Sequence, residues 1–120
     1  MKFMFMIYHD EKELDALPEG EMQVLIDSAL DYDDEIRRSG HYIVSDALQP
    51  AGTARTIRVR GGKVSTTDGP FAETKEQLGG FYLIEARDLN DAIQVAGRIP
   101  GARMGSIEVR PVWEPVPQPA

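Results

Sequence analysis

Two stretches with the period of an α-helix stand between strand-like runs, and this order limits the fold more than any other feature of the chain. Residues 21–39 and 88–99 carry apolar side chains at spacings of three and four, which is typical of a helix with one buried stripe. Asp88 is a favoured N-cap, Pro18 is expected in the first turn of the earlier helix, and Gly40 is expected as its left-handed C-terminal cap. The expected buried residues are Met22, Leu25, Ile26, Ala29, Tyr32 and Ile36, then Leu89, Ala92, Ile93, Ala96 and Ile99.

The remaining apolar and β-branched runs predict strands. These are residues 3–8, 41–48, 56–60, 63–67, 81–86 and 107–113. Gly61-Gly62 predicts a two-residue hairpin turn that sets Arg60 opposite Lys63. The order strand–helix–strand, hairpin, strand–helix–strand predicts an α+β fold, a ferredoxin-like antiparallel sheet with both helices on one face. We expect one domain over residues 1–114 and a flexible proline-rich tail over residues 115–120.

Residues 3–8 and 81–86 are apolar on both faces of their strands. Because helices cover only one face of the sheet, Met4, Met6 and Tyr8 would turn to the other face and lie in water. A contiguous apolar face on a protein surface usually marks an interface. We therefore expect a homodimer whose sheets meet face to face, with two-fold symmetry.

The hairpin places three cations, Arg58, Arg60 and Lys63, on one of its faces. Two interpretations stay open for them. They could form an anion-binding patch in an otherwise negative protein, or a solvated strand surface whose charges discourage edge pairing.

Composition excludes several classes of protein. A formal charge of −7 over 120 residues argues against nucleic acid as a partner. The absence of cysteine excludes disulfides and thiol catalysis. The apolar run near the N-terminus is too short for a signal peptide or a membrane span, so we expect a cytoplasmic protein without a membrane partner. His9 and His41 lack metal-site spacing, and no phosphate-binding glycine pattern occurs, so neither a metal nor a cofactor is expected.

Residues 68–81, DGPFAETKEQLGGF, differ from everything around them in carrying charges, glycines and a proline between two strands. Phe71 is expected to hold this loop against the core, and Thr74 and Gln77 have the spacing of a capping box that could start one helical turn. A loop fixed at both ends could hold carboxylates in place for acid–base chemistry. The alternative is a fixed connection whose charges lie in water.

The run 68–76, followed by Gly79-Gly80-Phe81-Tyr82, resembles the signature of the DGPF branch of YCII-related proteins. The likeness extends to Leu48-Gln49-Pro50, Arg98-Ile99-Pro100 and residues 108–111. The resemblance implies a dimeric α+β barrel of ferredoxin-like subunits. Relatives of this kind have been proposed to be enzymes with a histidine–aspartate pair, the histidine lying early in the first helix. This chain has no histidine between Glu11 and Gly40, so that pair is not carried over.

DGPF proteins also resemble companions of extracytoplasmic-function sigma factors, which implies a regulatory or sensing role. Two hypotheses follow. The protein binds a small organic ligand or a partner as an accessory to regulation, with Tyr8, Lys75 and Phe71 as ligand-binding residues. Alternatively, it is a small-molecule enzyme with lyase-like or dehydrochlorinase-like acid–base chemistry. Its catalytic residues would be Asp68, His41 and Glu73.

Overall fold

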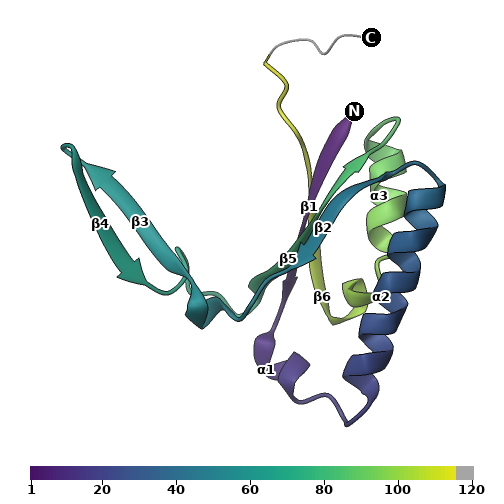
Figure 1. Ribbon diagram of the computed structural model, residues 1–120, viewed down its shortest axis with the longest axis horizontal. Coiled ribbons are helices and arrows are strands. Elements are labelled where there is room, and N and C mark those ends of the chain that lie inside the picture. Colours follow the sequence, from purple (N-terminus) through teal and green to yellow (C-terminus); the bar gives the residue numbers. More distant parts are fainter. Residues whose placement is uncertain (116–120) are drawn as a thin grey trace.

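The computed structural model describes residues 1–115 and contains one four-stranded sheet and one separate two-stranded ribbon (Figure 1). The sheet has the order β2-β5-β1-β6, and all three of its pairings are antiparallel. Its strands are β1 (Lys2–His9), β2 (Tyr42–Ala47), β5 (Gln77–Glu85) and β6 (Gly105–Pro111). This is the predicted ferredoxin-like order, with the first strand in the middle of the sheet. The predicted tail begins at Pro115, and residues 116–120 lie outside the described part of the chain.

Two helices, α2 (Glu21–Arg38) and α3 (Leu89–Gly97), cover one face of this sheet (Figure 1). Phe3, Phe5 and Ile84 are fully buried beneath them. The hydroxyl of Tyr32 on α2 donates a 2.6 Å hydrogen bond to the carbonyl oxygen of Val95 on α3, which ties the helices together. The core therefore lies between the helices and one face of the sheet, as the apolar periodicity predicts.

The helix boundaries and stripes differ in part from the prediction. The N-cap of α2 is Gly20, so Pro18 is not in its first turn but lies between α2 and a short preceding helix, α1 (Glu11–Asp15). In α3, Asp88 accepts a hydrogen bond from the Asp91 backbone N–H, so the predicted N-cap is confirmed. Three of the expected core positions are wrong, since Ile26 in α2 and Leu89 and Ile93 in α3 are 44–48% exposed, and Val95 is buried in α3 instead.

The two-stranded ribbon consists of β3 (Arg55–Arg60) and β4 (Lys63–Asp68), and we call it the arm. Its register pairs Arg60 with Lys63 and Val59 with Val64, as the Gly61-Gly62 turn predicts. The arm projects away from the sheet, and all six residues of β4 are exposed (Figure 1). Two short 3₁₀ turns, η1 (Ala51–Thr53) and η2 (Pro100–Met104), complete the described part of the chain.

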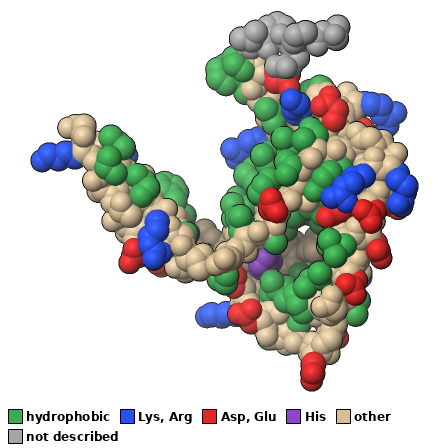
Figure 2. All heavy atoms as spheres, in the orientation of Figure 1, with side chains coloured by type: hydrophobic (Ala, Val, Ile, Leu, Met, Phe, Trp, Pro, Cys, Tyr) green, Lys and Arg blue, Asp and Glu red, His purple; other side chains and the backbone are tan. Residues whose placement is uncertain are grey.

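The sheet face opposite the helices carries apolar side chains with no covering element, and we call it the open face. Strand alternation turns Met4, Met6 and Tyr8 to this side, because their neighbours Phe3 and Phe5 lie in the core. The register adds the apolar residues opposite them, Leu83, Phe81, Leu78 and Val44. Figure 2 shows hydrophobic side chains on both sides of the V-shaped opening between the arm and the sheet.

The last strand is shorter than the sequence predicts. The last strand ends at Pro111, and Trp113, predicted to belong to it, is 85% exposed beyond it. Among residues 1–115 no helix is both long and apolar enough to cross a membrane.

Candidate ligand-binding site

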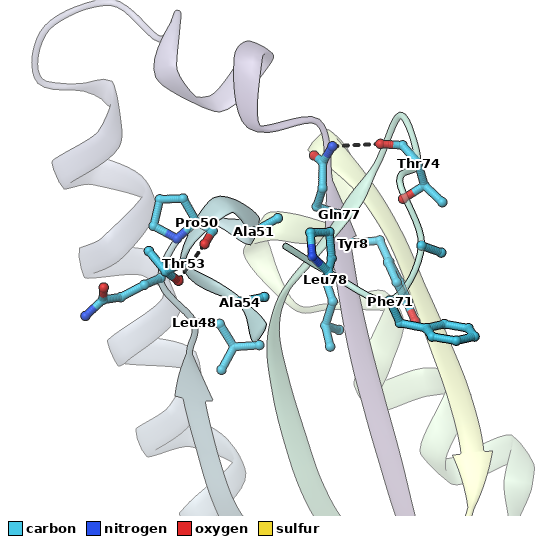
Figure 3. A pocket seen from close by; sticks show the side chains of 13 residues that line it. Tyr8, Leu48, Pro50, Ala51, Thr53, Ala54, Phe71, Thr74, Gln77 and Leu78 are labelled. Carbon is cyan, nitrogen blue, oxygen red and sulfur yellow. Dashed lines mark hydrogen bonds between the residues drawn. The ribbon is translucent and has the colours of Figure 1, made fainter. Parts of the chain in front are cut away.

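A pocket of about 620 Å³ lies where the arm leaves the sheet, and we call it the base pocket. Figure 3 shows residues 48–54 on one side of it and Phe71 and Thr74 on the other, with Tyr8, Gln77 and Leu78 between them. The two segments that carry the family resemblance in the first half and the middle of the chain, 48–50 and 70–74, thus meet at one cavity. A volume of this size is typical of small-molecule sites.

Side-chain hydrogen bonds from α1 and β5 hold the pocket walls together. The carboxylate of Glu11 accepts from the Ala51 backbone N–H at 3.2 and 3.1 Å, and so fixes η1. The Glu11 backbone N–H donates to the Gln77 side-chain oxygen at 3.4 Å, while Gln77 Nε2 donates to the Thr74 carbonyl oxygen at 2.7 Å. Three segments distant in sequence therefore share one network. Sequence analysis missed Glu11, because its charge pattern is that of any solvated helix.

The surface of the pocket is mainly apolar with a few polar groups. Leu48, Phe71 and Leu78 are exposed in it, while Tyr8 is half buried. The Tyr8 hydroxyl makes no hydrogen bond to protein within residues 1–115 and can donate to or accept from a bound molecule. Such a pocket suits a small, partly apolar organic molecule with one or two polar groups.

Phe71 lies in the pocket but does not do what its sequence context predicts. Its side chain is 79% exposed, so the expectation that it holds the loop against the core is wrong. The Arg58 guanidinium of the arm lies 5.6 Å from the centre of its ring, a cation–π contact. The expected helical turn is also absent from the described loop, because the Thr74 hydroxyl donates to the Glu76 carbonyl oxygen instead of capping a helix.

The three charged residues predicted in the loop lie outside the base pocket. Asp68 ends β4 with its side chain 88% exposed, and one carboxylate oxygen lies 3.1 Å from Arg55 Nε. Glu73 is exposed and does not line the cavity. Lys75 lines a neighbouring shallow cleft with acidic residues of the 10–15 segment. Of the six residues predicted for a site, only Tyr8 and Phe71 meet in the base pocket.

His41 lies at the other end of the sheet. It precedes β2, whose first residue pairs with Ile84, whereas the base pocket adjoins the end where Ala47 pairs with Gly80. The structure therefore does not bring His41 together with Asp68 or Glu73 within one chain.

The histidine instead links the C-terminus of α2 to the N-terminus of α3. Its Nδ1 lies 2.7 Å from the Ser39 hydroxyl oxygen, and its Nε2 lies 3.1 Å from Asp91 Oδ2. Hydrogen bonds from the Arg87 backbone N–H and then from His41 lower the pKa of Asp91 to about 2, although its partial burial acts in the opposite direction. Each of these groups also serves a helix end, so the geometry is that of a structural clamp. Within residues 1–115, no three His, Asp or Glu side chains converge as a metal site requires.

A second cavity, of about 360 Å³, lies between α2 and the sheet and contains a buried acid that sequence analysis missed. Asp33 is 8% exposed and accepts a hydrogen bond from the Tyr82 hydroxyl of β5. Burial, and then the carboxylate beside it, raise the pKa of Tyr82 above its usual range. A signal was present in the sequence, since Asp33 directly follows Tyr32 and stands three residues before Ile36, inside the apolar stripe.

The chain is similar to a curated protein in sequence and to a solved protein in structure. Over 67 residues the chain is 48% identical to the uncharacterized protein R00369 of Rhizobium meliloti strain 1021, covering 54% of each chain, so it spans about half the length of this relative. It is similar in structure to 5-chloro-2-hydroxyhydroquinone dehydrochlorinase (TftG) of Burkholderia phenoliruptrix AC1100, solved in complex with 2,5-dihydroxybenzoquinone. That likeness has a TM-score of 0.50 and 18% identity, over 95% of this chain and 94% of the other. At this identity the second likeness concerns the fold alone.

The family itself is shown by the sequence. The pattern of the YCII-related domain matches residues 1–115, which is all of the chain that the structure describes. The protein therefore belongs to the YCII-related domain family.

Proposed function

We propose that the protein is a cytoplasmic homodimer that binds a small, partly apolar organic molecule in the base pocket. The observation that carries this proposal is the lining of that pocket, where Leu48, Phe71 and Leu78 lie with Tyr8, whose hydroxyl has no partner among the described residues. Exposed leucine and phenylalanine side chains in a cavity of about 620 Å³ favour a ligand with an apolar body. The half-buried phenol favours a polar group on that ligand.

Ligand binding is tested by a thermal-shift screen of small phenols, quinones and carboxylic acids, with calorimetry on each compound that raises the melting temperature. Phe71→Ala removes the largest exposed apolar surface of the pocket and is expected to weaken binding about ten-fold, or ~1.4 kcal/mol. Trp113→Ala is the matched control, because Trp113 is 85% exposed against 79% for Phe71 and lies outside the pocket. The proposal fails if no compound stabilises the protein, or if both variants bind a compound as well as the unchanged protein does.

An accessory role in regulation is the biological setting that we propose for this binding. It rests on the resemblance of residues 68–76 to the DGPF branch, whose members resemble companions of extracytoplasmic-function sigma factors. The test is direct binding of the purified protein to an extracytoplasmic-function sigma factor, with and without a compound from the screen. Equal binding of a Phe71→Ala variant in the presence of the compound would contradict a role for the pocket in this control.

An acid–base enzyme is the second candidate, favoured by the fold that the chain shares with a dehydrochlorinase. In this candidate Asp68 is the general base, with Glu73 and His41 supplied by the arrangement of the dimer rather than by one chain. The Asp68 carboxylate, paired with Arg55 and 88% exposed, is accessible to a substrate. Turnover of chlorinated hydroxyquinols that disappears in Asp68→Asn would support this candidate, and turnover that survives the change would exclude Asp68 from it.

A further inference from the structure

The arm has an apolar face on which no other described segment of the chain packs. Register places Ile57, Val59 and Val64 on one side of the ribbon, and these side chains are 55%, 56% and 69% exposed. A two-stranded hairpin without a packed face is marginally stable in water. The arm therefore needs a partner surface that the rest of residues 1–115 does not supply.

The open face also carries apolar side chains that no other described segment covers. It lies across the V-shaped opening from the arm (Figures 1 and 2). Leu78 and Val44 are exposed on it, and Met4, Met6 and Phe81 are only half buried. The Cα radius of gyration is 16.6 Å, where a compact domain of this length has about 14 Å. An occupant of the opening would cover both apolar surfaces at once.

Charge indicates which occupant fits. The arm carries Arg55, Arg58, Arg60 and Lys63, four of the 13 cations of the chain, and only one of its 20 acids, Asp68. The chain as a whole has a charge of −7. A second copy of the chain offers a net negative body to the net positive arm, whose Arg58, Arg60 and Lys63 lie on the ribbon side opposite Ile57, Val59 and Val64. It also offers an apolar face to the open face, and two-fold symmetry lets each arm do the same for the other copy.

We propose that each arm clasps the second copy of the chain, and that this copy closes the base pocket. The pocket lies at the bottom of the opening, where the arm and the open face meet, and Tyr8 and Leu78 belong to both the pocket and the open face. A copy seated in the opening therefore roofs the cavity, and a single chain holds only half of the ligand site. This inference builds on the proposed function, because it makes the proposed ligand site a property of the dimer.

The clasp is tested by the oligomeric state. Val59→Thr/Val64→Thr keeps β-branched side chains, so the hairpin can still form, but removes its apolar face. We expect the dimer dissociation constant from sedimentation to rise at least about ten-fold. The matched control is Val24→Thr, since Val24 on α2 is 64% exposed but lies away from the opening. A wild-type monomer at micromolar concentration, or equal dissociation constants for the two variants, overturns the clasp.

Closure of the pocket is tested separately by thiol labelling, because the chain has no cysteine of its own. Leu48→Cys places a thiol in the pocket lining, and Val24→Cys places one on α2. We expect the thiol at position 48 to react at least about ten-fold more slowly in the dimer than after dilution to monomer, while the thiol at position 24 reacts equally in both. Equal labelling at position 48 in dimer and monomer overturns the roof. This measurement uses no ligand, so an unsuccessful compound screen does not change its outcome.

Discussion

The Tyr82 hydroxyl donates a hydrogen bond to the buried Asp33 carboxylate, and this bond joins the strand beside β1 to the middle of α2. A buried carboxylate without a partner is costly, so the pair fixes where α2 rests on the sheet.

Tyr82→Phe should lower the free energy of unfolding by about 1–3 kcal/mol, because it leaves the Asp33 carboxylate buried without its donor. Tyr8→Phe is the control, since its hydroxyl has no partner among the described residues and its loss should be nearly neutral. Urea denaturation measures both. The double change Tyr82→Phe/Asp33→Leu should recover part of the loss, and a double variant no better than Tyr82→Phe would contradict this account.

The Asp91 carboxylate should make the free energy of unfolding depend on pH in the acid range. Its folded pKa is about 2 against an ordinary value of 3.8, so its charge stabilises the fold fully above 3.8, and the contribution disappears as the pH falls through about 2. Asp91→Asn should therefore be less stable than wild type at pH 6, with a difference that shrinks between pH 4 and pH 2. Denaturant titrations across this range measure the difference, and a constant gap would show that the carboxylate charge is not its source.

Two glycines of the sheet should respond differently to an added methyl group. A Cβ at Gly105 would lie 1.8 Å from the Tyr8 carbonyl oxygen, whereas one at Gly79 would lie 1.9 Å from Cε1 of the His9 ring. The backbone cannot move aside, whereas a side chain can. Gly105→Ala should therefore lower the free energy of unfolding by about 1–3 kcal/mol, and no second substitution should restore it. Gly79→Ala should be rescued by His9→Ala. Gly97→Ala, with no atom within 4 Å, is the control, and thermal denaturation ranks the variants.

Asp68→Asn should change the free energy of unfolding by less than about 1 kcal/mol. Its carboxylate is 88% exposed, and the one ion pair it makes within residues 1–115, with Arg55, lies at the surface, where such pairs contribute little. Chemical denaturation of Asp68→Asn beside Arg55→Gln measures this. A loss of about 2 kcal/mol would instead assign Asp68 a structural role in the turn that follows it.

Sequence predicted the elements whose signals are local. Gly61-Gly62 set the hairpin register correctly, and Asp88 marked the start of α3, because each acts through backbone geometry within a few residues. The sheet order followed from the order of the elements and the limited ways in which two helices can cover one sheet.

The site depended on contacts between distant segments, which no local pattern contains. Its size and apolar character predict that Phe71 holds the loop against the core, but its side chain lies exposed in the lining of the base pocket. Glu11 fixes η1 from forty residues away, and Asp33 is polar within an otherwise apolar stripe. The predicted catalytic residues Asp68, His41 and Glu73 are not brought together within one chain, because His41 lies at the opposite end of the sheet, and no local pattern reveals such a separation in space.

The central position of β1 also determines when the protein can fold. Both of its neighbours come late in the chain, since Phe3 pairs with Ile84 on one side and Pro111 on the other. During synthesis the arm, whose strands are close in sequence, can form within microseconds of leaving the ribosome. Phe3 and Phe5 must instead wait, unpaired and exposed, until β5 and β6 have emerged, so the middle strand of the sheet is protected from aggregation later than the arm.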